Sequence, residues 1–493
     1  MSNLAILPII IPMLSGIIVA FTNSNVAVTR LLTKLFSIIS LLVSAYITYS
    51  VFIDGTIILE TGDWKAPYGI ILVADELSVL LLLTTNIIAA AAAFYAPQSL
   101  SLRQENHYFY TFFFLLITGV SGAFLTGDLF NLFVFFEVLL MASYALIVLG
   151  GDKVQLRESV KYVLINLFSS VLFVTTVALL YGVVGTVNMA QIAERVAEVE
   201  QDGILTTIGI LFFFVFGTKA ALFPLYYWLP KSYIVPNPVV SALFGALLTK
   251  VGIYSILRVF SLIFIHRMDY THDVFIWIAG LTMLFGVIGA LSTNNIKLII
   301  AYNIIPAIGF IIMGIGIFNQ DALSGSIYYL IQDMIIKSAL FLLVGVIAYV
   351  AGTSDLKKMK GLLHDHPVLG WLLFLSALIL AGIPPFSGFI GKLLLLKGAF
   401  SADEIIIAII ALLASLLILY SVMKIFIRGF WGEKDESLST TKKASAGMII
   451  PIIGLLAVAV FLGIGAEWIY PAIDGVAEYL LDPQLYIDSV LKE

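Results

Sequence analysis

The sequence predicts an all-α polytopic membrane protein with about 14 transmembrane helices, two inverted five-helix repeats and discontinuous helices 7 and 12. Hydrophobic residues make up 61% of the 493 residues and charged residues 12%, whereas soluble proteins average roughly half and a quarter. The apolar residues form long runs, and proline interrupts two of them. A water-soluble core cannot bury that much apolar surface, so we expect the helices to cross a bilayer.

The apolar runs have the length of membrane-spanning helices. Each is about 18 to 28 residues long, enough to cross a hydrocarbon core of roughly 30 Å. They are apolar on every face, which excludes a transmembrane barrel, because barrel strands alternate in polarity. The first run, Asn3 to Phe21, has no basic n-region and no cleavage site, so we expect a retained span. The expected spans are 3–22, 30–53, 70–97, 108–127, 129–150, 159–184, 204–229, 236–261, 273–293, 297–318, 322–350, 367–400, 404–430 and 447–470.

The loops between these spans alternate in charge. Odd-numbered loops hold the basic residues, as in the three lysines of 357–360, and even-numbered loops hold mainly acids, as in Glu194 and Glu198. Loop 8–9 is the weakest case, because Arg267 lies there among acids. Since Lys and Arg collect on the cytoplasmic side, the pattern predicts a multi-pass protein of the plasma membrane with both termini on the outer side.

Several chemistries are excluded or disfavoured. The chain has no cysteine, which excludes disulfides, thiolate metal sites and cysteine catalysis. We expect His364 and His366 to lie in a solvated turn rather than to bind a metal. No phosphate-binding loop, dinucleotide fingerprint or nucleophile elbow is present, so we expect no cofactor and no enzyme active site. The net charge of -5 implies no nucleic-acid partner.

The two interrupted runs predict how the chain is divided. Span 7 is broken at Pro224, and span 12 is broken at Pro384 and Pro385. Membranes tolerate such breaks where the gap lines a polar cavity. Because the breaks lie five spans apart, the segments that hold them have opposite orientations, as in an inverted repeat. We expect helices 1–3 at 1–107, the first repeat (helices 4–8) at 108–261, the second (helices 9–13) at 273–430, and helix 14 with a C-terminal tail at 431–493.

Isolated charges near the middle of the spans are the candidate functional residues. Glu137 lies midway along span 5, where a charge costs roughly 2.5 to 3.5 kcal/mol and needs a partner or a water-filled cavity. Lys219 lies five residues before Pro224, too deep to reach the interface. A Lys219–Glu137 pair could hold or release a proton depending on whether it is closed. The alternatives are a glutamate that only fixes helix packing and a static buried pair.

Further charges extend this candidate relay. Lys250 is central in span 8, and Lys392 follows the break in span 12. Span 11 supplies Asp333 and Lys337, which lie four residues apart on one helix face and could neutralise each other. Arginine stays protonated at any accessible pH, whereas a buried lysine can titrate, so lysines suit a proton relay.

Other charged residues are expected to lie at the membrane surface. We expect Lys161, Lys397 and Lys424 to extend their ammonium groups to the interface. Asp75 and Glu76 are expected at a solvated helix start rather than at an ion entrance.

The motifs around these charges resemble those of the antiporter-like proton-translocating subunits shared by respiratory complex I, membrane-bound hydrogenases and Mrp-type multisubunit Na⁺/H⁺ antiporters. The resemblance covers spans 3 to 13. Within the family, the segment from Thr126 to Asn131 and the chain length resemble the D-type subunit of the Mrp antiporters. The motifs are Thr126-Gly-Asp-Leu-Phe-Asn131 ahead of Glu137, Thr218-Lys219-Ala with Leu222-Phe-Pro224 and Trp228-Leu-Pro230, Thr249-Lys250-Val-Gly-Ile-Tyr254, Lys337 before Ser-Ala-Leu-Phe-Leu, and Gly382-Ile-Pro-Pro-Phe-Ser-Gly388 with Lys392.

The resemblance implies two half-channels joined by a hydrated axis of charges. It assigns Glu137 and Lys219 as a coupled pair, Lys250 as the connecting lysine, Lys337 as the central lysine and Lys392 as the terminal exchange residue. Relatives often carry histidines on the span-11 face, where this chain has Tyr329 and Asp333, so proton transfer there is expected to use Asp333, Lys337 and water.

The leading hypothesis is a subunit of a bacterial Na⁺/H⁺ antiporter complex that carries protons inward while Na⁺ leaves, with the other subunits and the lipid bilayer as partners. One alternative is the proton-pumping arm of a redox enzyme such as complex I or a membrane-bound hydrogenase. Another is a scaffold subunit whose charges only hold the complex together.

Overall fold

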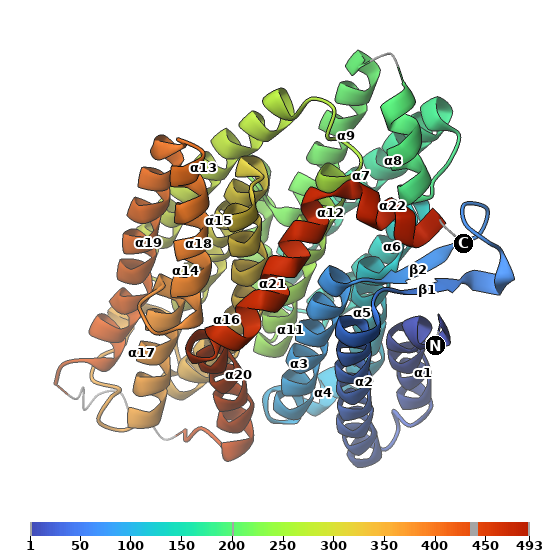
Figure 1. The fold of residues 1–493 in the computed structure, drawn as a ribbon. Coiled ribbons are helices and arrows are strands. Elements are labelled where there is room, and N and C mark those ends of the chain that lie inside the picture. The colour runs from blue at the N-terminus through green and yellow to red at the C-terminus, as the bar shows by residue number, and fades with distance from the viewer. Residues whose placement is uncertain (1, 200–201, 434–441, 492–493) are drawn as a thin grey trace.

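The structure is a computed structural model that describes residues 2–199, 202–433 and 442–491, and it confirms a helical membrane fold, with one short hairpin (Figure 1). In the described chain, 12 helical segments are long and apolar enough to cross a membrane. Two shorter apolar helices, Phe109–Leu125 and Pro367–Ala381, occupy the places of expected spans 4 and 12. The fold class is therefore confirmed, whereas a count of fourteen spans stays a prediction.

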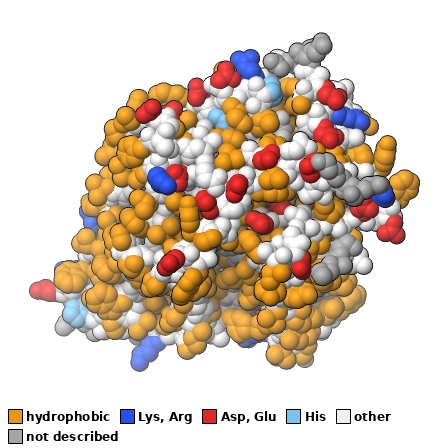
Figure 2. Space-filling model, viewed as in Figure 1, with side chains coloured by type: hydrophobic (Ala, Val, Ile, Leu, Met, Phe, Trp, Pro, Cys, Tyr) orange, Lys and Arg blue, Asp and Glu red, His pale blue; other side chains and the backbone are white. Residues whose placement is uncertain are grey.

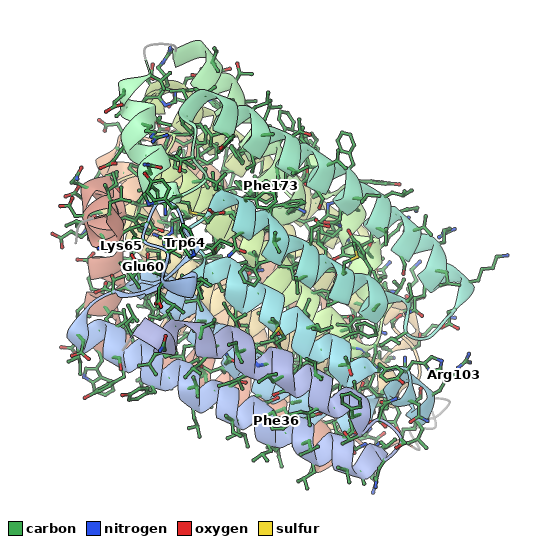
Figure 3. The ribbon with its side chains drawn as sticks, turned by 90° about the vertical axis from the view of Figure 1, so that its right-hand side faces the viewer. Phe36, Glu60, Trp64, Lys65, Arg103 and Phe173 are labelled. Carbon is green, nitrogen blue, oxygen red and sulfur yellow. The ribbon has the colours of Figure 1, made fainter. Side chains whose placement is uncertain are left out.

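The N-terminal part forms one side of the bundle. The helices are α1 (Leu7–Phe21), α2 (Val26–Asp54), α3 (Glu76–Ser99) and the short α4 (Leu102–Asn106), after a 3-10 turn at Ser2–Ile6. An antiparallel hairpin that was not predicted from the sequence joins α2 to α3, with β1 (Ile57–Glu60) and β2 (Ile71–Ala74) in the register Ile57 opposite Ala74. Figure 3 places the hairpin residues Glu60 and Trp64 at one end of the bundle and Arg103 at the other.

The next segment corresponds to the expected first repeat. Its last transmembrane segment contains a π-helical turn, η4, directly before α12. The elements are α5 (Phe109–Leu125), α6 (Leu129–Val148), α7 (Lys153–Val184), α8 (Met189–Glu198), α9 (Asp202–Ala220), η3 (Leu225–Trp228), α10 (Leu229–Ile234), α11 (Pro238–Leu243), η4 (Phe244–Leu248) and α12 (Thr249–Leu262).

The segment that follows corresponds to the expected second repeat, and it contains the central helix of the molecule. Nearly every side chain of α16 is buried, because α15, α18, α20 and α21 all pack against it. The elements are α13 (Met268–Ser292), α14 (Ile296–Tyr302), α15 (Ile304–Ile317), α16 (Gln320–Ala351), η5 (Leu356–Lys358), α17 (Pro367–Ala381), α18 (Ser387–Ser401), α19 (Ile405–Ile425) and η6 (Phe426–Phe430).

The C-terminal tail is helical. After the membrane-length α20 (Ala446–Ile464), α21 (Ala466–Leu481) and α22 (Pro483–Leu491) cross the front of the bundle in Figure 1 and pack on α16, α12 and α8. Hydrophobic side chains cover much of this face, as expected of a surface in contact with lipid, and acidic side chains lie mainly in its upper half (Figure 2).

A single turn motif occurs four times in the described part of the chain, in two matching pairs. In each copy the threonine Oγ1 accepts a hydrogen bond from the N–H two residues later, at 3.1 to 3.3 Å. The Asp or Asn at that position then caps the next helical segment. The four copies form two antiparallel bridges, Asp128 with Asn188 and Asn295 with Asp355, each spanning 60 residues of sequence. These two pairs agree with a repeated fold, although the repeat boundaries stay a prediction. The copies are Thr126-Gly-Asp128, Thr186-Val-Asn188, Thr293-Asn-Asn295 and Thr353-Ser-Asp355.

One copy holds a carboxyl group in an unfavourable environment. Asp128 is 5% exposed, and burial raises its pKa to about 6, against the opposing effect of hydrogen bonds from the backbone N–H groups of Asn131 and Phe130. The folded state therefore binds more protons than the unfolded state between roughly pH 4 and 6, so stability falls as pH rises through that window.

Replacing Asp128 with Asn should remove this pH dependence and keep the helix cap, since Asn188 and Asn295 already cap helices from the equivalent turn. We expect the Asp128→Asn complex to be more stable at pH 7, by on the order of 2 to 3 kcal/mol. Thermal unfolding of the purified complex between pH 4 and 8 measures this. Asp128→Ala is the control, because it removes the cap at every pH. An unchanged slope in Asp128→Asn would contradict the assignment.

Candidate ion-relay site

Three of the predicted charges meet at the centre of the molecule. Asp333 Oδ2 lies 2.8 Å from Lys250 Nζ, and Asp333 Oδ1 lies 3.4 Å from Lys337 Nζ. All three side chains are fully buried. Lys250 Nζ also donates a hydrogen bond of 3.0 Å to the Gly245 carbonyl in the π-helical turn before α12. Neither ion pair has hydrogen-bond alignment, so charge attraction holds the trio together.

Asp333 and Lys337, which could neutralise each other on one helix, are joined by a third charged group. The carboxylate is closer to Lys250, which comes from α12, in the segment expected as the first repeat. One carboxylate faces two ammonium groups, so the trio carries an excess positive charge when every group is ionised. Such a charge is costly in a desolvated site. The trio is electrically neutral when one lysine has given up its proton.

Lys219 and Glu137, the second candidate pair, are not joined directly in this structure. Lys219 Nζ on α9 donates a hydrogen bond of 3.2 Å to Ser170 Oγ and lies 5.0 Å from the centre of the Phe136 ring. Glu137 lies within electrostatic range of Lys219, but no ion pair joins them in the described structure. Glu137 Oε1 is buried without a hydrogen-bond partner. The pair is therefore open in this conformation, with the ammonium on a neutral oxygen.

The two helix breaks have the same backbone geometry. After α9, Ala221 takes a left-handed conformation (φ 64°) and the Leu222 N–H closes on the Gly217 carbonyl at 2.9 Å. After α17, Gly382 is left-handed (φ 82°) and the Ile383 N–H closes on the Leu378 carbonyl at 3.1 Å. Both are Schellman endings. In each case a proline follows three residues after the left-handed residue, at Pro224 and Pro385.

Lys219 and Lys392 lie in the two expected repeats, one in each, but they are not at equivalent positions relative to the breaks. Lys219 precedes its break, whereas Lys392 follows its break and reaches back across it. Lys392 Nζ donates to the Ala381 carbonyl at 2.8 Å and the Leu380 carbonyl at 3.2 Å, the last carbonyls of α17. Glycine at 382 leaves room for this, because a Cβ there would lie 2.9 Å from Lys392 Cδ. At the first break, the Trp228 indole N–H donates instead, to Thr218 O at 3.1 Å.

Several buried polar groups on α16 and at the start of α18 have no protein hydrogen-bond partner in the described structure. Both amide atoms of Gln332, the Tyr329 hydroxyl, Ser338 Oγ and Ser387 Oγ have no hydrogen-bond partner in the described structure. Buried polar groups are nearly always hydrogen-bonded, to protein or to ordered water. These side chains are therefore free to bond ordered water.

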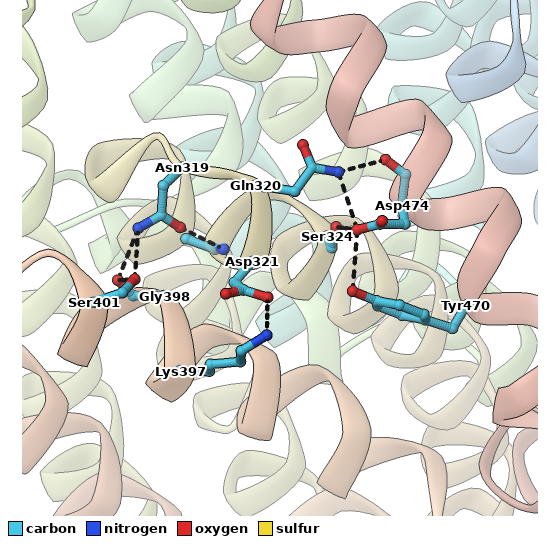
Figure 4. A network of polar contacts seen from close by, with 10 residues as sticks. Asn319, Gln320, Asp321, Ser324, Lys397, Gly398, Ser401, Tyr470 and Asp474 are labelled. Carbon is cyan, nitrogen blue, oxygen red and sulfur yellow. Dashed lines mark hydrogen bonds and ion pairs between the residues drawn. The ribbon is translucent and has the colours of Figure 1, made fainter.

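A polar network connects the start of α16 to α21 and α18 (Figure 4). Asp474 Oδ1 on α21 accepts hydrogen bonds from Gln320 Nε2 at 3.0 Å, Ser324 Oγ at 2.9 Å and the Tyr470 hydroxyl at 3.1 Å. Beside it, Lys397 is paired with Asp321 at 2.8 Å. Asp474 was not predicted from the sequence, since an acid in a tail that follows the last expected span looks like any solvated residue.

A second buried ion pair was also missed. Asp75 Oδ2 lies 2.5 Å from the Arg258 guanidinium, with side-chain exposures of 1% and 4%. Arg258 lies over the rings of Tyr254 and Tyr486, at 5.5 and 5.0 Å. The expectation of a solvated Asp75 is therefore wrong, although Asp75 does cap α3 by accepting from the Ser78 N–H. A lone arginine inside the apolar run 236–261 was the available signal.

The lysines that were expected at the membrane surface differ in their contacts. Lys397 and Lys161 make surface ion pairs, the latter with Glu158. Lys424 is buried and donates hydrogen bonds to the carbonyls of Leu291 and Thr293 at the end of α13, and its expected position at the interface stays a prediction. His364 is exposed. Within the described ranges, no group of three or more His, Asp or Glu side chains is placed to hold a metal.

Comparisons with known proteins give this geometry a family. The model of the family described as "NADH:quinone oxidoreductase/Mrp antiporter, TM" matches residues 126–418. The D subunits of the Na(+)/H(+) antiporters of Bacillus subtilis (strain 168) and of Alkalihalophilus pseudofirmus are each 49% identical to this chain over 493 residues, covering 100% of both sequences in each comparison. The resemblance to the D-type subunit expected from the motifs is thereby confirmed.

Solved structures agree in fold. A chain of the Mrp complex from Dietzia sp. DQ12-45-1b superposes with a TM-score of 0.92 at 30% identity, covering 100% of both chains. A chain of respiratory complex I from Thermus thermophilus superposes with a TM-score of 0.83 at 23% identity, covering 97% of this chain and 100% of that one. The latter likeness concerns the fold alone. By sequence and by structure, the chain belongs to the family of NADH:quinone oxidoreductase and Mrp antiporter transmembrane subunits.

Proposed function

We propose that this chain is the proton-translocating subunit of a multisubunit Na⁺/H⁺ antiporter complex, moving H⁺ inward in exchange for Na⁺. The observation that carries the proposal is the carboxylate of Asp333, shared between Lys250 and Lys337. This carboxylate connects α12 to α16, which belong to different expected repeats, through fully buried titratable groups. The D-type relatives bear the name of Na⁺/H⁺ antiporters, which favours a transporter subunit over a redox enzyme and makes the other antiporter subunits its partners.

The orientation follows from the charged loops. With the basic loops in the cytoplasm, both termini and the start of α16 face outward. The network around Asp474 then lies at the outer end of α16. Ser324, Tyr328 and Gln332 follow at four-residue intervals, which places them on one face of the helix. We infer that protons enter along this face and reach Lys392 at the break.

The step through the centre is a competition for one carboxylate. Asp333 fully neutralises only one ammonium group at a time, so adding a proton to Lys337 weakens the hold of Asp333 on Lys250. Lys392 lies within electrostatic range of both Lys337 and Asp333, and its own partners are neutral carbonyls. The charge on Lys392 therefore depends on that of the trio.

The step after Lys250 leads to Lys219 and then to the cytoplasm. The helices of the two lysines approach closely, since a Cβ at Gly252 would lie 3.1 Å from the Lys219 carbonyl carbon. Lys219 in turn binds Ser170 on α7. From there a stripe of buried polar side chains runs at helical spacing to the start of α7, at Ser169, Asn166, Tyr162, Ser159 and Gln155.

Glu137 gives this path a controlling element. When Lys219 leaves Ser170 for Glu137, the charge pair closes and the proton is held. When the pair opens, as in this structure, the ammonium rests on a neutral hydroxyl and is more easily discharged. We infer that sodium movement, in this subunit or in a neighbouring one, is coupled to this opening and closing.

The test is Na⁺-driven pH change in vesicles that contain the whole complex. We expect Lys392→Ala and Lys219→Ala to lower the initial rate by at least about tenfold while the complex still assembles. Lys397→Ala is the matched control, because Lys397 lies on the same helix as Lys392 but is exposed and paired with Asp321. Full activity in an assembled Lys392→Ala complex would overturn the proposal. Iron–sulfur or flavin subunits in the purified native complex would favour the redox alternative instead.

A further inference from the structure

A groove on the lipid-facing surface lies outside the relay. It has a volume of about 560 Å³. Residues of α3 form its floor, and residues of α2 and α20 form its walls. Both α2 and α20 pack on α3, and Figure 1 shows where the three helices lie. The lining residues are Lys34 and Leu41 of α2, then Ile87, Ala90, Ala91, Phe94 and Gln98 of α3, and Gly447, Ile450, Pro451, Gly454, Leu455 and Val458 of α20.

The groove is polar at one end only. Lys34 and Gln98 are its polar side chains, and the lining from Phe94 to Ile87 is apolar. The floor from Gln98 to Ile87 is roughly 16 Å long at the rise of an α-helix. At Gly454 an added Cβ would meet no atom within 4 Å, so the groove is open along its wall.

Lys34 provides an uncompensated positive charge at the polar end. It lies eight residues after the start of α2, one turn deeper than Arg30, which is fully engaged with Glu105 through two hydrogen bonds of 2.7 and 2.8 Å. The ammonium of Lys34 is 5.5 Å from the centre of the Phe94 ring. Among the described residues no carboxylate is within ion-pair distance of it. A lysine at this depth keeps its ammonium at the level of the lipid headgroups.

We propose that this groove is a binding site for an anionic phospholipid, with the phosphate on Lys34 and Gln98 and one acyl chain along α3. A cation beside an apolar groove matches a ligand with an anion at one end and a hydrocarbon chain behind it. The proposal does not depend on the proton path.

The test uses the purified whole complex, stripped of lipid by detergent and titrated with phosphatidylglycerol or phosphatidylcholine of the same acyl chains. We expect phosphatidylglycerol to raise the melting temperature more than phosphatidylcholine and to remain bound in native mass spectrometry. Two variants should each lose this difference. Lys34→Met removes the charge, and Gly454→Leu fills the groove.

Two matched controls should keep the difference. Lys231→Met removes an exposed lysine elsewhere, and Gly182→Leu enlarges an exposed glycine of α7 that also has open space around it. If Lys34→Met loses the difference between the two lipids but Gly454→Leu keeps it, the groove is not the binding site. The lipid preference would then come only from the surface charge of Lys34. If the Gly454→Leu complex loses a neighbouring subunit, the occupant of the groove is a protein and the proposal of a lipid site is wrong.

Discussion

Replacing Asp333 with Asn should abolish antiport and weaken the complex. The change leaves Lys250 and Lys337, both fully buried, without an anionic partner in the described structure. Removing one member of a buried ion pair costs about 3 to 5 kcal/mol, and the remaining lysines either lose their protons or displace the helices. Na⁺-driven pH change in vesicles, compared with the yield of assembled complex, measures both effects.

A second substitution separates transport from assembly. Asp333→Asn combined with Lys250→Met removes one cation along with the anion, so the yield of complex should recover. Antiport should stay absent, because the link between the two halves of the chain is gone. Restored antiport in the double variant would mean that the trio only holds the helices together, as a scaffold subunit requires.

Replacing Arg258 with Met should destabilise the complex as strongly as Asp333→Asn does. The residues of the relay keep their contacts in this variant. Asp75 would remain 1% exposed with no cation beside it, at a similar cost of about 3 to 5 kcal/mol. The loss should appear as a lower melting temperature and as proteolysis of the C-terminal helices, since Arg258 also contacts Tyr486 on α22.

Neutralising both members of this second pair provides the contrast. Asp75→Asn with Arg258→Met leaves no buried charge, and replacing a buried pair with neutral groups of similar volume is often tolerated. Assembly and antiport should both recover. If the double variant assembles but does not transport, Asp75 and Arg258 belong to the ion path and their assignment as a structural pair is wrong.

The difference between the two pairs also explains what the sequence could predict. The relay lysines can be seen in the sequence as single charges inside long apolar runs, at Lys219, Lys250, Lys337 and Lys392. They can be found without knowing which residues they contact. Their partners were not predictable, because contacts form between distant segments. Arg258 and Asp75 are 183 residues apart, and the π-helical turn that supplies the Gly245 carbonyl to Lys250 has no local sequence signal.

Residues near the ends of spans were the least predictable. Asp75 stands where a charge usually reaches water, so the sequence favoured a solvated position, and packing of neighbouring helices decided otherwise. The hairpin of β1 and β2 was missed because each strand has four residues. The helix breaks were predictable, since proline cannot continue a helix. The contact of Lys392 with the carbonyls before its break was not predictable, because it depends on the rotamer of the lysine side chain.

The placement of Asp333 and Lys337 on one uninterrupted helix limits the influence of membrane voltage. Their charged atoms, Asp333 Oδ1 and Lys337 Nζ, lie 3.4 Å apart, which is at most about one ninth of a 30 Å hydrocarbon core. A proton that passes between them crosses no more than that fraction of the field, so a potential of 100 mV contributes at most about 0.3 kcal/mol to this step. The pull of one carboxylate on two lysines is larger. Voltage therefore acts mainly on the longer stretches that lead to the two membrane surfaces.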